Sequence, residues 1–219
     1  MSLTNILTNV RAAEAKAGRD VGSTTVIAVS KLQPLERITS LLAAGHRHFG
    51  ENRVQEAMGK WPQLREQHTD LTLHLLGPLQ SNKVRAAMGL FQAIHSIDRS
   101  SLVARIARIA DDLGHCPDLF IQVNTGEEPQ KSGVFPVNLT ELIRNVQDLQ
   151  LPLVGLMCIP PIGDESALHF SLLANLAQDH DLKGLSMGMS SDYETAIHLG
   201  ATHTRIGTAI FGQRNISLR

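Results

Sequence analysis

Short apolar runs alternate along the chain with longer segments in which apolar residues recur every three or four positions. The short runs predict buried strands, and the longer segments predict amphipathic helices. In segment 100–113, for example, Leu102, Ile106 and Ile109 fall on one helical face. The predicted strands are 24–30, 47–49, 71–76, 92–96, 118–123, 153–158, 184–187 and 203–206. The predicted helices are 3–16, 34–44, 54–66, 81–88, 100–113, 139–149, 165–177 and 192–199.

Repeated alternation of strand and helix predicts a parallel sheet with helices outside it. About eight such units in a chain of 219 residues favour a closed (β/α)8 TIM barrel over an open doubly wound sheet. We therefore expect residues 1–219 to form a single α/β domain. The helix at 3–16 precedes the first strand, and little chain follows Gly212. This extra N-terminal helix is expected to cover the position that a final long helix would otherwise fill.

Several helix ends carry local signals. Pro34 suits a first helical turn because its missing N–H is not needed there. Gly45 is expected to end the same helix. Ser191 and Glu194 form a capping-box pattern, which predicts that a helix begins beside Ser191.

Composition narrows the class of protein. A net charge of −1, a pI near 6.8 and 4% aromatic residues argue against a nucleic-acid binder. No run approaches the roughly 20 apolar residues that cross a bilayer, and residues 1–20 lack the apolar core of a signal peptide. We therefore expect a cytoplasmic protein with no membrane partner. Cys116 and Cys158 are expected to be buried free thiols, and His46 and His48 to have packing or surface roles rather than bind a metal.

The most informative residue is Lys31, which ends the first predicted strand. Active sites of TIM barrels lie at the C-terminal ends of the strands. An imine there requires a neutral amine, so the ordinary lysine pKa of ~10.4 must be lowered by partial burial or a nearby cation. A strand-end lysine more often extends into solvent, so Lys31 alone does not establish this chemistry.

A possible phosphate site follows predicted strands seven and eight, the usual place for one in this fold. Ser190 follows strand seven, and Gly207 and Thr208 follow strand eight. Glycine lets the backbone approach an anion, and the hydroxyls add donors. Helix capping explains Ser190 and Thr208 equally well. An amine together with a phosphate cradle is what pyridoxal phosphate requires.

Arg205 lies within the last predicted strand, where a buried guanidinium needs a partner. It is expected to face either the site or a buried carboxylate. Because arginine neither loses its proton nor accepts a hydrogen bond, it would leave a facing pyridine nitrogen unprotonated. That weakens the cofactor as an electron sink and argues against transaminase or decarboxylase chemistry.

The chain resembles a known family, the YggS/PROSC pyridoxal phosphate homeostasis proteins. The resemblance covers nearly the whole chain, and the order and number of the matching stretches carry it. These stretches are 28–31, 49–52, 54–56, 74–83, 96–99, 122–124, 131–133, 155–157, 185–190 and 205–214.

The resemblance implies a barrel like the N-terminal domain of alanine racemase, without that enzyme's second domain. It implies that Lys31 holds pyridoxal phosphate as a Schiff base and that Arg205 faces the pyridine nitrogen. It assigns phosphate binding to Ser190, Gly207 and Thr208. It places Asn52 and Met187 in the pocket lining. Proteins of this family bind and deliver the cofactor without an established catalytic activity.

Two positions depart from the family pattern. Gln33 stands where a second lysine is common, and Arg53 stands where a tyrosine is common. Gln33 removes an alternative amine, and Arg53 places a positive charge near the pocket entrance. Lys131 is retained and is expected to act as a secondary amine.

Three functions are weighed. The leading hypothesis is a monomeric, non-catalytic protein that buffers pyridoxal phosphate or hands it to apo-enzymes. The second is a slow amino-acid racemase, which would need a second base opposite Lys31; the only tyrosine, Tyr193, is a weak candidate. The third is a cofactor-free barrel that forms a Schiff base between Lys31 and a sugar phosphate.

Overall fold

Parallel strands close into a barrel in the computed structural model, which describes residues 2–212. The order runs from β1 to β8, and β8 pairs back onto β1 with Ile27 opposite Arg205. The strands are β1 (Thr25–Val29), β2 (His48–Glu51), β3 (Thr72–Leu75), β4 (Ala93–Ile97), β5 (Asp118–Val123), β6 (Leu153–Cys158), β7 (Gly184–Ser186) and β8 (His203–Ile206). The predicted (β/α)8 barrel is confirmed. Positions 213 and 214 of the resemblance lie outside the described residues.

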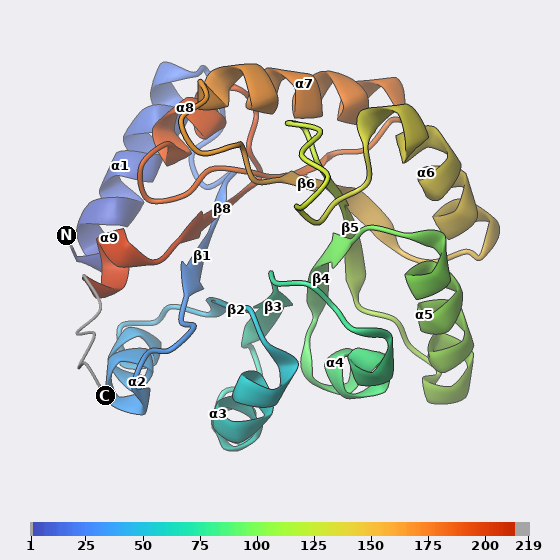
Figure 1. Cartoon of the computed structure of the whole chain (residues 1–219). Helices are drawn as coiled ribbons and strands as arrows, with labels where there is room; N and C mark the ends of the chain where they lie inside the picture. Colours follow the sequence, from blue (N-terminus) through green and yellow to red (C-terminus); the bar gives the residue numbers. More distant parts are fainter. Residues whose placement is uncertain (1, 213–219) are drawn as a thin grey trace.

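Helices surround this barrel in chain order, as Figure 1 shows. They are α1 (Leu3–Lys16), α2 (Leu35–Ala43), α3 (Val54–Gln67), α4 (Val84–Leu90), α5 (Ser100–Leu113), α6 (Leu139–Asp148), α7 (Ser166–Asp179), α8 (Tyr193–His198) and α9 (Thr208–Phe211), with 3₁₀ turns η1 (Ser81–Lys83) and η2 (Pro136–Asn138). Helix α1 lies between α8 and α2 in the ring and packs against α8. The extra N-terminal helix therefore completes the ring, as predicted.

The hydrophobic core lies mainly between the barrel and its helices. Trp61, Phe170 and Ile38 are fully buried there, where apolar helix faces meet outward-pointing strand residues. The inside of the barrel is more polar. A hydrogen bond joins His95 on β4 to Ser186 on β7, so both side chains must point into the interior.

Three local predictions need correction. The segment predicted as one helix at 81–88 begins as the 3₁₀ turn η1, with the N–H of Lys83 bonded to the carbonyl of Gln80. The capping box at Ser191 is wrong: α8 begins after Asp192, whose carboxylate accepts the N–H of Met189 at 2.6 Å. Helix α9 was not predicted because four residues are too few to show a helical period.

Both cysteines are free thiols, in agreement with the sequence analysis. Cys158 is buried, whereas Cys116 is only partly buried. Burial raises the pKa of Cys116 to about 11 and that of Cys158 to about 12, so both stay protonated at neutral pH. Between residues 2 and 212, no helix combines the length and apolar character needed to span a membrane.

Candidate functional site

Lys31 lies two residues beyond β1, at the C-terminal end of the barrel. Strand alternation puts Ile27, Val29 and Lys31 on one face of β1. Ile27 pairs with Arg205 of β8 in the strand register, so this face continues toward the last strand. Lys31 is half-buried. The residue is therefore partly enclosed at the end of its strand.

The backbone after Lys31 is held in an unusual conformation. Leu32 has a φ of 59°, in the left-handed region that costs a leucine about 1–3 kcal/mol. Its N–H donates to Oε1 of Glu56 at 2.6 Å. Although burial opposes it, hydrogen bonding from Lys60 and Leu32 lowers the pKa of Glu56 and keeps this acceptor charged. The strained turn is thus secured by a carboxylate from α3.

A buried network also secures Ser30, on the other side of Lys31. The Ser30 hydroxyl donates to Oε1 of the fully buried Glu51 at 2.8 Å, and the Trp61 indole N–H donates to the same oxygen at 3.1 Å. Lys60 lies 3.0 Å from Glu51 and donates to the Ser30 carbonyl at 3.1 Å. Lys60 also pairs with Glu56 at 2.6 Å. One ammonium group therefore links the carboxylate that holds Ser30 to the carboxylate that holds Leu32. Sequence analysis missed this network, although the spacing of Glu56 and Lys60 on a helix could have indicated their pairing.

Arg205 points into the barrel and is almost fully buried. Its Nη1 donates to the Ser186 hydroxyl at 2.8 Å, and its Nη2 donates to the Cys158 carbonyl at 2.7 Å. Burial lowers the pKa of Arg205, but a guanidinium that starts near 12.5 keeps its proton. Among residues 2–212 no carboxylate lies within ion-pair distance of it. Of the two alternatives expected for Arg205, pairing with a buried carboxylate is therefore not the one found among these residues, and neutral oxygen atoms accept from the guanidinium instead.

The three predicted phosphate ligands come together beside the end of β1. Gly207 is the N-cap of α9, and Thr208 is the first residue of that helix. A Cβ at Gly207 would lie 3.5 Å from that of Val29, which places this turn against β1. Ser190 accepts the Ala209 N–H at 3.3 Å, so its hydroxyl caps α9 from another loop. The capping interpretation of Ser190 is thus correct in this structure, and phosphate binding stays a prediction.

Asn52 and Met187 occupy different layers. Asn52 is half-buried and lines a hollow of about 210 Å³ with Gln122, Asn124 and Lys131, at the C-terminal ends of β2 and β5. Met187 is fully buried in the hydrophobic core, and its neighbour Ser186 is the residue that faces the barrel interior. Asn52 therefore lies at the barrel opening, whereas the Met187 side chain packs in the core.

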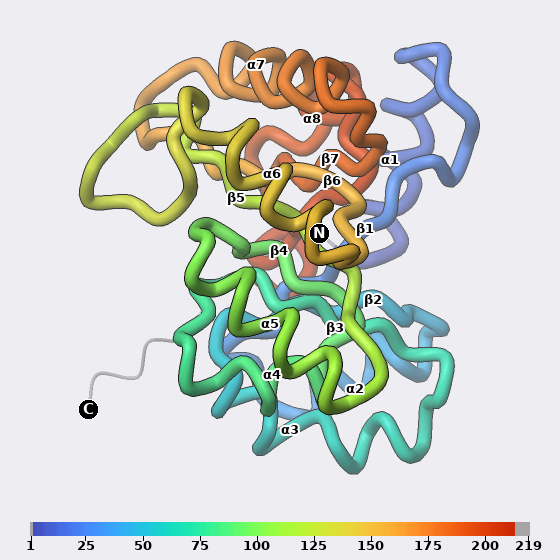
Figure 2. The backbone as a smooth tube through the Cα atoms, turned by 90° about the vertical axis from the view of Figure 1, so that its right-hand side faces the viewer, coloured from blue at the N-terminus to red at the C-terminus, as the bar shows by residue number. Residues whose placement is uncertain are grey.

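Two further residues from the sequence analysis lie around this opening. Lys131 belongs to the loop after β5, which projects from the barrel in Figure 2, and pairs with Glu128 at 2.5 Å. Arg53 is exposed and lines a neighbouring polar hollow with Asn52 and Lys83. This side of the opening therefore carries the cationic side chains of Arg53 and Lys83, whereas Lys131 is paired with a carboxylate.

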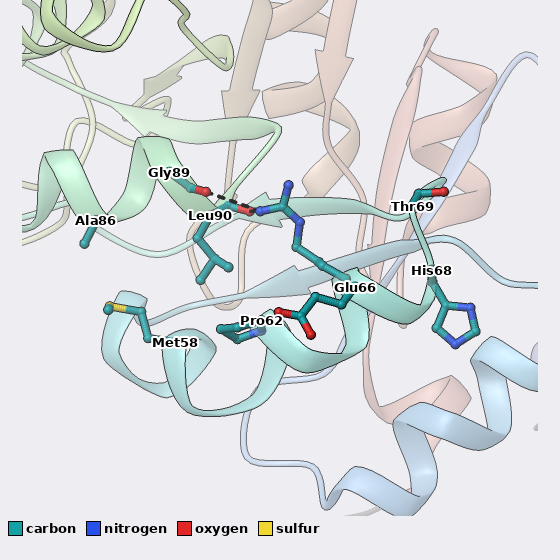
Figure 3. A pocket seen from close by; sticks show the side chains of 9 residues that line it. Met58, Pro62, Glu66, His68, Thr69, Ala86, Gly89 and Leu90 are labelled. Atoms are coloured by element: carbon teal, nitrogen blue, oxygen red, sulfur yellow. Dashed lines mark hydrogen bonds between the residues drawn. The ribbon is translucent and has the colours of Figure 1, made fainter.

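A separate groove lies on the outside of the molecule, between α3 and α4 (Figure 3). It is lined in part by Met58, Pro62, Ala86 and Leu90, and Arg65 donates to the Leu90 carbonyl across it at 2.8 Å. None of the predicted site residues lines this groove. Polar residues, among them Glu66 and Thr69, also line it, and its place between two outer helices sets it apart from the barrel opening.

Comparisons with known proteins agree with this arrangement. Residues 1–215 match the family model described as alanine racemase, N-terminal domain. The pyridoxal phosphate homeostasis protein of Vibrio cholerae is 40% identical over 227 residues, covering 99% of this chain and 96% of that protein. The protein of the same name from Pseudomonas aeruginosa is 41% identical over 221 residues, covering 98% and 95%.

Solved structures show the same likeness. PipY of Synechococcus elongatus, solved with pyridoxal phosphate bound, is 42% identical with a TM-score of 0.80, covering 93% of this chain and 99% of PipY. An alanine racemase from Clostridium difficile has a TM-score of 0.68 at 15% identity, covering 99% of this chain and 58% of that one. This second likeness is one of fold alone.

Proposed function

Because this chain belongs to the YggS/PROSC family of pyridoxal phosphate homeostasis proteins, built on the alanine racemase N-terminal domain, we propose that it binds pyridoxal phosphate covalently through Lys31. It buffers the cofactor and hands it on to apo-enzymes in the cytoplasm, as a monomer. The proposal is supported by the placement of Lys31 after β1, of Arg205 on the paired strand β8, and of the Ser190–α9 turn beside the end of β1 in a closed barrel.

The donor set fits this cofactor. Lys31 offers a half-buried amine, and Arg205 offers a buried guanidinium with no carboxylate partner in residues 2–212. A hydroxyl at Ser190 and the first backbone N–H groups of α9 suit an anion. Gly207 presents no side chain that would block a phosphate.

Each residue then has a defined task. Bound pyridoxal phosphate supplies an aldehyde that an amine attacks and a pyridine ring that withdraws electrons. Lys31 would hold the cofactor through its aldehyde, and the network of Glu51, Glu56 and Lys60 would orient the lysine by holding the backbone on either side. Arg205 would face the ring nitrogen as a hydrogen-bond donor and, because a guanidinium keeps its own proton, would leave that nitrogen unprotonated.

The environment of Tyr193 favours a role without catalysis. A racemase needs a second base on the opposite face of the cofactor. The hydroxyl of Tyr193 bonds to Asn9 and Glu194, each at 3.3 Å, in the contact between α8 and α1. That contact lies in the outer layer of helices. Tyr193, the only tyrosine of the chain, therefore packs α8 against α1.

A spectroscopic titration tests the proposal. Purified protein titrated with pyridoxal phosphate should develop a visible absorption band at one equivalent, and Lys31→Ala should lose it. Lys131→Ala, a matched change at the barrel opening, should keep the band. A colourless native protein, or a band that persists in Lys31→Ala, would contradict the proposal. Robust racemase turnover would contradict its non-catalytic part.

A further inference from the structure

Three histidines lie end to end inside the barrel. Nδ1 of His48 is 3.2 Å from Nε2 of His74, and Nδ1 of His74 is 3.0 Å from Nε2 of His95. They come from the adjacent strands β2, β3 and β4. His74 and His95 are buried, whereas His48 is half-buried, so the row runs from the partly exposed side of β2 into the interior.

The row continues across the barrel to Arg205. Nδ1 of His95 is 2.9 Å from the hydroxyl of Ser186, on β7. That hydroxyl also accepts from Nη1 of Arg205 at 2.8 Å. Four consecutive hydrogen bonds therefore link Arg205 to His48.

Arg205 sets the direction of the whole row. A guanidinium only donates, so the Ser186 oxygen accepts from it. The serine proton is then free to be donated to Nδ1 of His95, which places the His95 proton on Nε2. His95 therefore donates to Nδ1 of His74, and His74 in turn donates from Nε2 to Nδ1 of His48. Each imidazole accepts at Nδ1 and donates at Nε2.

The opposite direction is less favourable. If Nδ1 of His95 donated to Ser186, that hydroxyl would accept twice and its own proton would have no partner in the described hydrogen bonds. Leaving a fully buried donor unpaired costs about 1–3 kcal/mol. A difference of that size favours the directed arrangement by roughly 5-fold to 150-fold.

The surroundings keep these imidazoles uncharged. Burial lowers the pKa of His48 and lowers those of His74 and His95 well below the usual value. Phe120 stacks on His95 with ring centres 4.2 Å apart, which adds an apolar wall. Neutral rings are the form that a directed row requires, because a charged imidazole would donate from both nitrogens.

We propose that His48, His74, His95 and Ser186 form a one-way hydrogen-bond relay that positions Arg205, with each imidazole in the Nε2–H form. The four are positioning residues, because Ser186 holds the guanidinium and the histidines fix the orientation of the Ser186 hydroxyl. The consequence for the cofactor ring rests on the proposed function, whereas the direction of the relay does not.

The direction can be read from ¹⁵N NMR of histidine-labelled protein without cofactor. Two-bond ¹H–¹⁵N correlations distinguish the two neutral forms of an imidazole, and His→Gln variants assign the signals. His48, His74 and His95 should each show only the Nε2–H form, whereas exposed His115 should show averaged signals. Nδ1–H forms or mixed populations in the row would overturn the proposal.

A substitution tests the coupling. Ser186→Ala should convert the single signals of all three histidines, including His48 three hydrogen bonds away, into mixed populations. Ser186→Thr keeps the hydroxyl and should restore single forms. A change confined to His95 would overturn the relay in favour of local packing. The measurement on the native protein decides the direction even if a variant fails to fold.

The positioning of Arg205 has its own readout. In protein loaded with pyridoxal phosphate, Ser186→Ala should shift the visible band while borohydride still fixes the cofactor on Lys31, and Ser186→Thr should return the band to its native position. An unshifted band would overturn the positioning role. A native protein that binds no cofactor would instead refute the proposed function and leave the NMR result standing.

Discussion

At the scale of single residues, side chains of β2 and α3 hold the backbone on either side of Lys31 by hydrogen bonds. Ser30 and Leu32 are each tied to a carboxylate, and Lys60 joins the two carboxylates. Lys60 pairs with two acidic partners, so we assign it a structural role. The strained turn at Leu32 is thereby stabilised where the amine must be presented.

Removing the shared cation should be costly. Lys60→Met removes the ion-pair partner of the buried Glu51 carboxylate, and breaking a buried pair by removing one partner costs about 3–5 kcal/mol. Urea unfolding at pH 7.5 measures the loss. The exposed Lys183→Met should change the free energy of unfolding by less than about 0.5 kcal/mol. Similar small values for both variants would refute the structural role of Lys60.

At the scale of elements, the sequence predicts strands and long helices well because their apolar periods extend over many residues. The helices at Leu3–Lys16 and Ser100–Leu113 begin and end at the predicted residues. Short helices and turns depend on tertiary contacts, so the apolar periodicity of the sequence does not predict them. Helix α9 is an example, since a hydroxyl from the β7–α8 loop caps it.

The same limit applies to the candidate site. Strand-end positions indicated Lys31, Ser190 and Gly207, because the ends of parallel strands converge in any barrel. The partner of Arg205 could not be predicted, because Ser186 and Cys158 reach it from other strands. The histidine row escaped notice for a similar reason, since its members are separated along the chain and come together only when β2, β3 and β4 pair.

Close strand packing gives a prediction at this scale. A Cβ at Gly155 would lie 2.0 Å from the carbonyl oxygen of Gly184 on the adjacent strand, so Gly155→Ala should destabilise the fold by about 3 kcal/mol or more. Gly59→Ala in α3 meets open space and should stabilise it by roughly 0.5–1 kcal/mol. Thermal unfolding compares the two. A tolerated Gly155→Ala would contradict the packing of β6 against β7.

At the scale of the whole molecule, closing the barrel brings β1 beside β8 and surrounds a polar interior. Lys31 and Arg205 are far apart in the chain, but Lys31 follows β1 and Arg205 lies on β8, the strand that pairs with β1. The inside of the barrel holds neutral histidines and the buried guanidinium of Arg205. The hydrophobic core lies outside the barrel wall, between the strands and the surrounding helices. Stability should therefore depend on pH through the buried histidines, those of the barrel interior and His46 beside Phe49 of the core.

Acid should weaken the fold before most carboxylates titrate. Burial lowers the pKa of His46 and His203 to about 4, whereas unfolded histidine titrates near 6.5. The unfolded state therefore binds more protons between these values, and stability falls as pH falls. From pH 7.5 to 5.5 each of the two should lower the free energy of unfolding by about 1.3 kcal/mol. The lowered pKa values of His48, His74 and His95 act in the same direction.

Urea unfolding at the two pH values measures this loss. His203→Phe should reduce the difference by about one histidine's share, or ~1.3 kcal/mol, and the exposed His115→Gln should leave it unchanged. Equal stability of the native protein at pH 7.5 and 5.5 would contradict the neutral interior.

The central claim is that Lys31 is the residue that holds pyridoxal phosphate. Borohydride reduction of the loaded protein, followed by peptide mapping with mass spectrometry, tests it most directly. The account predicts one reduced adduct per chain, on the peptide that contains Lys31, and none on that peptide in Lys31→Ala. An adduct located on Lys131 or Lys60 in the native protein, or no adduct at all, would contradict it.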